Sequence, residues 1–461
     1  MSLLNPTEIY SKLPISARQL AITLVGYKNR RIRYGKHYRE QRALLERSQY
    51  WSESEMLEYQ TDQLARLLYE ARTFTPAYRE LPHLTRDELR VMIARHDFSA
   101  LPILEKSDLR AATDQYRNRS RDAASVGRTS GTTGSPMRTE RDRESVERTF
   151  AFIVQHRGWL GLTEQSRSVR LSGRLVVPVE RQKPPFWMMN RAENQLLLST
   201  YHLSERYADA IREKLERFQP ELIDGYPSAI IELGKLLGPA ARFPSLKGII
   251  TTAETLDDGM RATLTDLYGC PVLDYYAASE GVPFIQECER GRYHIRPESG
   301  IFEFHDEHGK EVGPGETGEL VVTSFCNFRT PLIRYRTGDL ATRSTSGLTC
   351  ECGRTLPVVH KIVGRREATA LTTDGREIGL FAHRVLTPLS GIKASQIVQL
   401  APDKFTVSVV PERGVSMEDI SISVLDSLEN VLGYRPNVEF IKVEQVPRGP
   451  NGKQTAFIRK F

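Results

Sequence analysis

The sequence has few cysteines, no long apolar run and no large excess of charge, and each of these absences excludes a class of protein. Five cysteines among 461 residues, an odd number, do not suit a disulfide-stabilised secreted protein, so we expect a reducing, cytoplasmic setting. No stretch approaches the roughly 18 uninterrupted apolar residues of a transmembrane helix. The N-terminus also lacks the charged-then-apolar order of a signal peptide.

The charge of the chain gives no sign of a nucleic-acid partner. The 64 basic and 58 acidic residues are interleaved and leave a net charge of only +6. One exception is the basic stretch "YKNRRIRYGKHYREQR" at residues 27–42, which follows the apolar run "LAITLVGY". We interpret it as a surface helix that packs one face on the protein, with a patch for a membrane surface or an anionic partner as the alternative.

The order of apolar patterns predicts a large α/β domain followed by a smaller one. Helical spacing dominates residues 52–110 and 143–162, and between residues 166 and 281 short apolar strands alternate with helices. This alternation favours a parallel sheet, in which ligands bind at the carboxyl ends of the strands. Hairpin-like strands follow from 296 to 342, and residues 368–461 resemble a separate α+β unit. We therefore predict an N-terminal domain over 1–364, with a β subdomain, and a small mobile domain over 365–461.

The segment "TSGTTGSP" at residues 129–136 concentrates small and hydroxyl-bearing residues. Such a loop presents backbone N–H groups and hydroxyls at close range, which suits a phosphate chain; a flexible linker is the alternative. It is not a Walker loop, because no lysine follows its last glycine. The later "GPNGKQ" has a Gly-Lys pair, but Pro447 stands where the first glycine of that motif is required.

Six segments, taken in order, resemble the adenylate-forming superfamily of acyl-CoA synthetases, peptide adenylation domains and luciferases. They are "TSGTTGSP" (129–136), "TTAE" (251–254), "YYAASEG" (275–281), "YRTGDL" (335–340), "GRRE" (364–367) and "PRGPNGKQ" (447–454). Within the superfamily, "DGYPS" (224–228) and "CECGRT" (350–355) are most similar to the phenylacetate-CoA ligase branch. The stretch "PPFWMMNRAENQLLLSTYHLSE" (184–205) resembles the capsule-associated, CapK-like members of that branch.

The resemblance implies an enzyme that joins a carboxylic acid to AMP and then transfers the acyl group to coenzyme A. It implies ATP, Mg²⁺ and coenzyme A as cofactors, and an aryl or small apolar acid as substrate. Three alternatives stay open: transfer of the acyl group to an amine, transfer of AMP itself as in F390 synthetases, and a catalytically retired scaffold in polysaccharide biosynthesis. A homodimer is also left open.

The resemblance assigns the phosphates to the hydroxyl and N–H groups of the first segment and gives three later residues their own roles. Glu280 is implied to hold Mg²⁺, Asp339 to accept hydrogen bonds from the ribose, and Arg365 to position ribose or phosphate, with a surface salt bridge as its alternative. The remaining ATP-binding residues implied are Thr129, Ser130, Gly131, Thr132, Thr133, Gly134, Ala253, Glu254, Tyr275, Tyr276, Ala277 and Ser279.

Lys453 is implied to bridge the carboxylate and the α-phosphate as charge develops in the transition state. It lies on the small domain, which must therefore swing in for adenylation and out for the second step. The hinge position after "GR" holds Glu367 where relatives usually have Asp or Lys. Ser135 is a second departure, since many relatives carry lysine there.

Two further sites follow from the same resemblance. The acyl pocket is expected beside the matched segments, at Tyr226, Pro227, Ala253 and Ala277, with Tyr276 nearby; each of these also suits a plain core position. Cys288, His294, Cys350 and Cys352 offer three thiols and one imidazole, which make a complete tetrahedral set for a structural zinc ion. Reduced thiols on a tight turn are the alternative.

Overall fold

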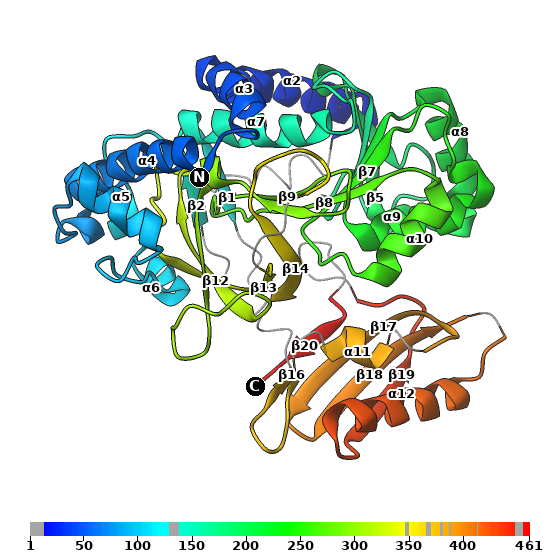
Figure 1. Ribbon diagram of the computed structural model, residues 1–461. Coiled ribbons are helices and arrows are strands. Elements are labelled where there is room, and N and C mark those ends of the chain that lie inside the picture. Colours follow the sequence, from blue (N-terminus) through cyan, green and yellow to red (C-terminus); the bar gives the residue numbers. More distant parts are fainter. Residues whose placement is uncertain are drawn as a thin grey trace, which may run out of the picture.

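The computed structural model describes residues 13–128, 138–345, 350–365, 370–378, 381–386, 389–412, 414–447 and 455–461. A large α/β part is followed by a separate C-terminal α+β part, drawn in orange and red in Figure 1. This arrangement confirms the fold class expected from the sequence; the boundary near residue 364 stays a prediction. Among the described residues, no helix is both long and apolar enough to cross a membrane.

The large part is built on one mixed sheet, which has twelve strands within the described ranges. Its order is β11-β12-β13-β14-β10-β9-β8-β7-β6-β3-β5-β4. The neighbours β5, β3, β6, β7 and β8 run parallel, as the alternation of strands and helices predicts. These five strands are β3 (Ser168–Ser172), β5 (Gln195–Ser199), β6 (Leu222–Gly225), β7 (Gly248–Thr252) and β8 (Val272–Tyr276).

Helices cover both faces of the parallel strands, which are therefore buried on both sides. On one face α8 (Ala208–Phe218), α9 (Pro227–Leu237) and α10 (Asp258–Tyr268) pack on alternate strand residues such as Ile223 and Ile249. On the other face lies α7 (Arg143–Gly158), seen above the sheet in Figure 1. Side chains that alternate with Ile223 and Ile249 therefore point toward α7.

The rest of the large sheet is antiparallel and forms the expected hairpins. Here β11 pairs with β12 and β12 with β13, and β14 joins β13 to the short strands β10 and β9. The edge strand β4 (Trp187–Asn190), which pairs with β5, was not anticipated from the sequence. The antiparallel strands are β9 (Ile285–Glu287), β10 (Tyr293–Ile295), β11 (Gly300–His305), β12 (Thr317–Ser324), β13 (Tyr335–Arg343) and β14 (Val358–Arg365).

The N-terminal basic stretch forms two helices rather than one. The break falls at Gly35, where a Cβ atom would lie 2.2 Å from the carboxylate of Glu147 on α7. That same carboxylate accepts a hydrogen bond from the backbone N–H of His37 at 2.9 Å and so anchors the start of the second helix. The N-terminal helices are α2 (Ile15–Arg33), α3 (Lys36–Ser48), α4 (Glu53–Phe74), α5 (Arg86–Arg95) and α6 (Lys106–Ala111).

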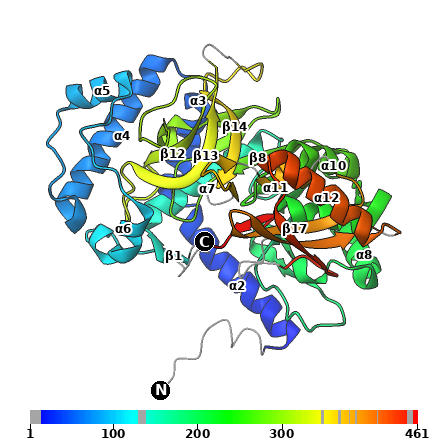
Figure 2. The same ribbon diagram turned by 90° about the horizontal axis from the view of Figure 1, so that it is seen from below.

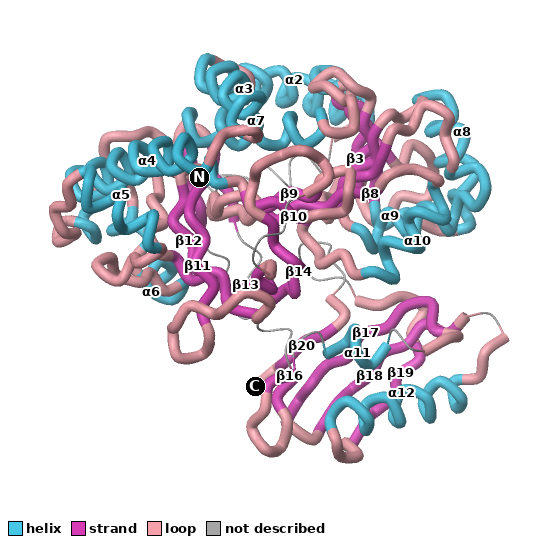
Figure 3. Tube along the Cα trace, in the orientation of Figure 1, coloured by secondary structure: helices cyan, strands magenta, loops and turns pink. Residues whose placement is uncertain are grey.

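The C-terminal part has its own sheet and its own apolar core. Its main sheet has the order β19-β18-β17-β20, and α12 packs Val424 and Leu428 against Val407 and other residues of the sheet. Figure 3 shows this two-layer arrangement, and Figure 2 shows it from below. Its elements are β15 (Ala370–Leu371), β16 (Glu377–Ile378), α11 (Phe381–Leu386), β17 (Ile392–Ala401), β18 (Lys404–Pro411), α12 (Met417–Leu432), β19 (Asn437–Lys442) and β20 (Phe457–Arg459).

Candidate functional site

Residues from three distant segments meet at Asp339 on β13. The Tyr276 hydroxyl at the end of β8 donates to Asp339 Oδ2 at 2.7 Å, and Arg365 Nε at the end of β14 lies 2.8 Å from Asp339 Oδ1. Asp339 and Arg365 are direct partners in the β13–β14 register. The Asp339 carboxylate is buried, and burial together with its charge raises the pKa of Tyr276 well above its usual value. The tyrosine therefore stays a donor, and each carboxylate oxygen keeps a lone pair for a further partner.

The loop after β7 is tied to the start of α9. Ala253 has a φ of 71°, a left-handed conformation that is uncommon for a residue with a side chain. The next residue, Glu254, accepts a hydrogen bond from the backbone N–H of Ser228 at 3.2 Å. Gly225, which ends β6, is required by close packing: a Cβ atom there would lie 1.8 Å from the carbonyl oxygen of Leu171. The segments "DGYPS" and "TTAE" are thus held side by side.

The loop after β8 is fixed by two side chains that the sequence analysis did not single out. Arg141, the last residue of β2 (Arg138–Arg141), donates through Nη2 to the carbonyl oxygens of Ala278 and Ser279, at 3.0 and 2.8 Å. Asn327 Nδ2 donates to the carbonyl oxygen of Glu280 at 2.9 Å. Glu280 itself is buried. Burial lowers the pKa of Arg141, whereas the negative charge of Glu280 raises it.

Part of the expected site lies outside the described residues. This holds for the whole phosphate-binding segment from Thr129 to Gly134, for Glu367 and for Lys453. The strands β1 (Ser125–Arg128) and β2 flank the segment that is expected to bind phosphate, and their register pairs Arg128 with Arg138. Since Arg141 ends the same hairpin, the hairpin connects that segment to the loop that carries Glu280.

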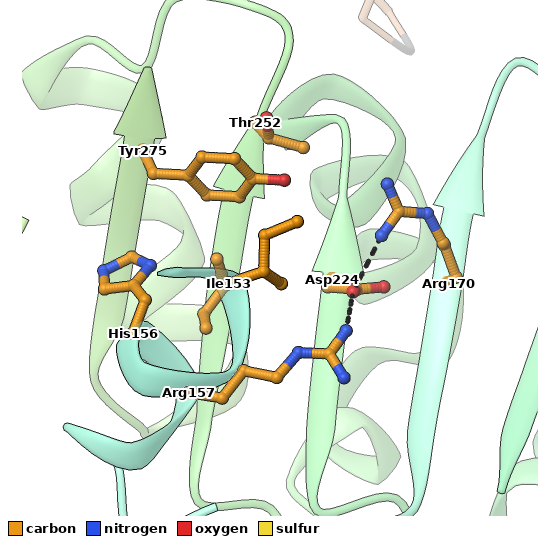
Figure 4. A pocket seen from close by; sticks show the side chains of 8 residues that line it. Ile153, His156, Arg157, Arg170, Asp224, Thr252 and Tyr275 are labelled. Atoms are coloured by element: carbon orange, nitrogen blue, oxygen red, sulfur yellow. Dashed lines mark hydrogen bonds and ion pairs between the residues drawn. The ribbon is translucent and has the colours of Figure 1, made fainter. Parts of the chain in front are cut away.

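A small cavity lies between α7 and the carboxyl half of the parallel strands (Figure 4). Thr252 at the end of β7 and Tyr275 on β8 line it, together with the charged side chains of Arg157, Arg170 and Asp224. Tyr226, Pro227, Ala253 and Ala277, where the acyl pocket was expected, are not among the described residues that line it. Tyr226 instead packs partly against the core beneath α9.

The four cysteine and histidine side chains expected to hold zinc come together. Their donor atoms all lie within 4.8 Å of one another, with Cys288 Sγ 3.6 Å from Cys350 Sγ and Cys352 Sγ 3.4 Å from His294 Nε2. A tetrahedral zinc ion with Zn–S bonds of about 2.3 Å holds its sulfurs about 3.8 Å apart. The other ring nitrogen, His294 Nδ1, lies 3.0 Å from the carbonyl oxygen of Leu356, which orients Nε2 toward the sulfurs. The set fits a closed structural site.

Comparison with known proteins finds relatives that are similar over most of this chain. The profile of the CapK C-terminal domain matches residues 371–460. The chain is 27% identical to Protein CapK of Staphylococcus aureus over 471 aligned residues, which cover 97% of each chain. It is also 27% identical to the phenylacetate-coenzyme A ligase of Thermus thermophilus over 342 residues, which cover 67% of this chain and 70% of that ligase.

The fold is also found in solved structures. That of 2-hydroxyisobutyryl-CoA ligase, in the postadenylation state in complex with 2-HIB-AMP, superposes with a TM-score of 0.69 and 19% sequence identity. The match covers 90% of this chain and 93% of that one. The same ligase has been solved in complex with 2-HIB-AMP and CoA in the thioesterification state, where the TM-score is 0.56.

Proposed function

Because this chain belongs to the adenylate-forming superfamily, in the CapK-like group of its phenylacetate-CoA ligase branch, we propose that it activates a carboxylic acid with ATP and passes the acyl group to coenzyme A. The observation that carries the proposal is the meeting of Tyr276, Asp339 and Arg365. These residues come from three separately matched segments, and a retired scaffold would have no need to keep a buried carboxylate between them. Phenylacetate-coenzyme A ligases are the named relatives that support the acceptor.

In the first step, an oxygen of the acid forms a bond to the α-phosphorus of ATP, and the bond from that phosphorus to the bridging oxygen of pyrophosphate breaks. Asp339 accepts hydrogen bonds from the ribose hydroxyls, and Arg365 adds a positive charge at the same place. Both orient the nucleotide before the reaction rather than take part in it. The hydroxyls and N–H groups of the segment 129–134 hold the phosphates.

Two charged groups act on the reacting phosphates. Glu280, a buried carboxylate, offers the hard oxygen that Mg²⁺ prefers, and a bound Mg²⁺ would neutralise phosphate charge. Lys453 contacts the acid and the α-phosphate and stabilises the charge that builds between them. In the second step the thiolate of coenzyme A attacks the carbonyl carbon and AMP leaves. We place both steps in the cytoplasm, where ATP and coenzyme A are made.

Pyrophosphate release in the presence of a panel of acids tests the proposal. We expect ATP-dependent release with a subset of acids, and thioester formation when coenzyme A is added. Release without a thioester, but with an amide when amines are added, would favour the amide-forming alternative. The absence of both release and ATP binding would favour a non-catalytic scaffold and end the proposal.

A further inference from the structure

The cavity beside α7 contains a cluster of three charged side chains. Arg157 Nη2 and Arg170 Nη1 both lie close to Asp224 Oδ2, at 2.8 and 2.9 Å, as the dashed lines of Figure 4 show. Two guanidinium groups and one carboxylate leave this cluster with a net charge of +1. Asp224 is only 4% exposed, whereas the Arg170 side chain is 31% exposed, so the carboxylate is removed from water while one guanidinium group stays accessible. Positive charge held in such a place favours an anionic partner.

Arg174 is a further arginine close to this cluster. Arg174 follows β3 four residues after Arg170, and among the residues that the structure describes no Asp or Glu forms an ion pair with it. Its pKa is lowered by desolvation and then by repulsion from Arg170 and Arg33. Glu254, in the loop after β7, accepts a hydrogen bond from the backbone N–H of Ser228. The carboxyl ends of β3 and β6 therefore carry an excess of positive charge.

Only one of the two carboxylate oxygens of Asp224 has hydrogen-bond partners among the described residues. Both arginines contact Asp224 Oδ2, whereas the buried Oδ1 has no hydrogen-bond partner among the described residues. A buried acceptor without a donor is costly, and a ligand hydroxyl would satisfy it. The enclosed space has room for about one water molecule, which suits a hydroxyl group. Any group larger than a hydroxyl would have to displace Ile153 or the ion pairs, both of which line the same space, so a larger group of the ligand has to bind outside it.

The position of the cavity connects this cluster to the acid. Thr252 and Tyr275 line it, and the residues that follow them, Ala253 and Tyr276, belong to the proposed nucleotide site. Tyr275 and Tyr276 are consecutive on β8, so Tyr275 faces the cavity beside α7 while Tyr276 faces the other side of the sheet, and the cavity and the proposed nucleotide site lie on opposite faces of the strand near its carboxyl end. An acid whose carboxylate reaches the α-phosphate would have to pass the carboxyl ends of β7 and β8 to bring its remaining atoms to this cluster. Arg170 on β3 and Asp224 on β6 are register partners, and their side chains lie on the face of the sheet that is covered by α7.

We propose that the acid activated by this enzyme is a hydroxy acid with a second anionic group, either a carboxylate or a phosphate. The second anion binds Arg170 and Arg174, and a hydroxyl donates to Asp224 Oδ1. This inference rests on the proposed adenylation and narrows its substrate class, away from the aryl or small apolar acid that the family resemblance implies. Arg157 keeps Asp224 in place and is a positioning residue.

The test compares malate, galactarate and 3-phosphoglycerate with phenylacetate and benzoate in pyrophosphate release. We expect kcat/KM for at least one of the anionic hydroxy acids to exceed that for phenylacetate by more than about tenfold. Arg170→Gln and Arg174→Gln should remove most of this preference while the KM for ATP changes less than about twofold. Preference for 3-phosphoglycerate over both diacids would identify phosphate as the second anion, and the reverse would identify carboxylate.

Arg167→Gln is the matched control, because Arg167 lies just before the first residue of β3, does not line the cavity and forms an ion pair with Glu221. A wild-type enzyme that prefers phenylacetate overturns the inference. So does an equal fall of kcat/KM with all acids in Arg170→Gln and Arg174→Gln. If no acid releases pyrophosphate, the proposed function fails, and calorimetry then tests the inference by itself. Binding of one of the anionic acids to the wild type, abolished in Arg170→Gln, supports the inference. No binding of these acids overturns it.

Discussion

At the scale of single residues, Asp339 is the most informative position, because one buried carboxylate serves two protein partners and, in our proposal, the ribose. Asp339→Asn keeps an acceptor for Tyr276 but removes the negative charge that faces Arg365. A hydrogen bond to a charged group contributes about 1.5–3 kcal/mol, so we expect the KM for ATP to rise about 10- to 100-fold. Pyrophosphate release at varied ATP measures this. Tyr276→Phe, which removes one neutral donor, should have the smaller effect; equal ATP affinity in Asp339→Asn and wild type would contradict the assignment.

Asp274, on the opposite side of β8 from the cavity, gives a prediction about stability. Burial raises its pKa to about 6 from 3.8, although Thr251 and Tyr293 donate hydrogen bonds to it. A raised pKa means that the folded state binds this proton more tightly, so the stabilisation is complete below pH 3.8 and is lost as the pH rises through 6. Between pH 5 and 8 this group should lower the free energy of unfolding by about 1 kcal/mol.

Denaturant titrations of Asp274→Asn at several pH values measure that contribution. The variant should show a smaller decline of the unfolding free energy between pH 5 and 8 than the wild type. Asp209→Asn, which changes a carboxylate that is 94% exposed, should follow the wild type. Parallel pH profiles for Asp274→Asn and wild type would contradict the raised pKa.

At the scale of elements, the cysteine–histidine set connects the end of β9, the strand β10 and the turn before β14. If it holds zinc, as its geometry supports, metal analysis should find one zinc ion per chain. Cys352→Ser should lose the metal and lower the melting temperature by several degrees, because metal binding contributes to folding free energy. Cys270→Ser changes a half-buried cysteine outside the set and should keep the metal. A metal-free wild type with the same melting temperature in a chelator would contradict this.

The elements also show what could be predicted from the sequence. Four of the parallel strands, β3, β6, β7 and β8, and the helices α8, α9 and α10 were predicted because each has a clear apolar period and a turn after it, whereas β5 was not singled out as a strand. The strand β4 was not, since "WMMN" is short and its turn to β5 contains no glycine or proline. Arg141 and Asp224 act through contacts with residues far away in the chain, at Ser279 and Arg157. Such contacts depend on tertiary packing and leave no pattern in the local sequence.

At the scale of the whole molecule, the proposal needs the C-terminal part to deliver a lysine to a site built on the large sheet. Before the segment that carries Lys453, the backbone N–H of Val443 donates to the carbonyl oxygen of Val409 on β18, and after it β20 pairs with β17. The small sheet therefore holds the chain on both sides of that segment, so we expect the lysine to move together with the C-terminal part.

Lys453→Ala separates the two half-reactions for this reason. We expect pyrophosphate release to fall by orders of magnitude while ATP still binds, because the lysine stabilises charge only in the adenylation transition state. Transfer to coenzyme A from a supplied acyl adenylate should keep its rate, since the lysine has left the site by then. Lys404→Ala, a change at an exposed lysine on β18, serves as the control. Unchanged pyrophosphate release in Lys453→Ala would remove the lysine from the mechanism, and an equal loss in both half-reactions would mean that the C-terminal part acts without moving.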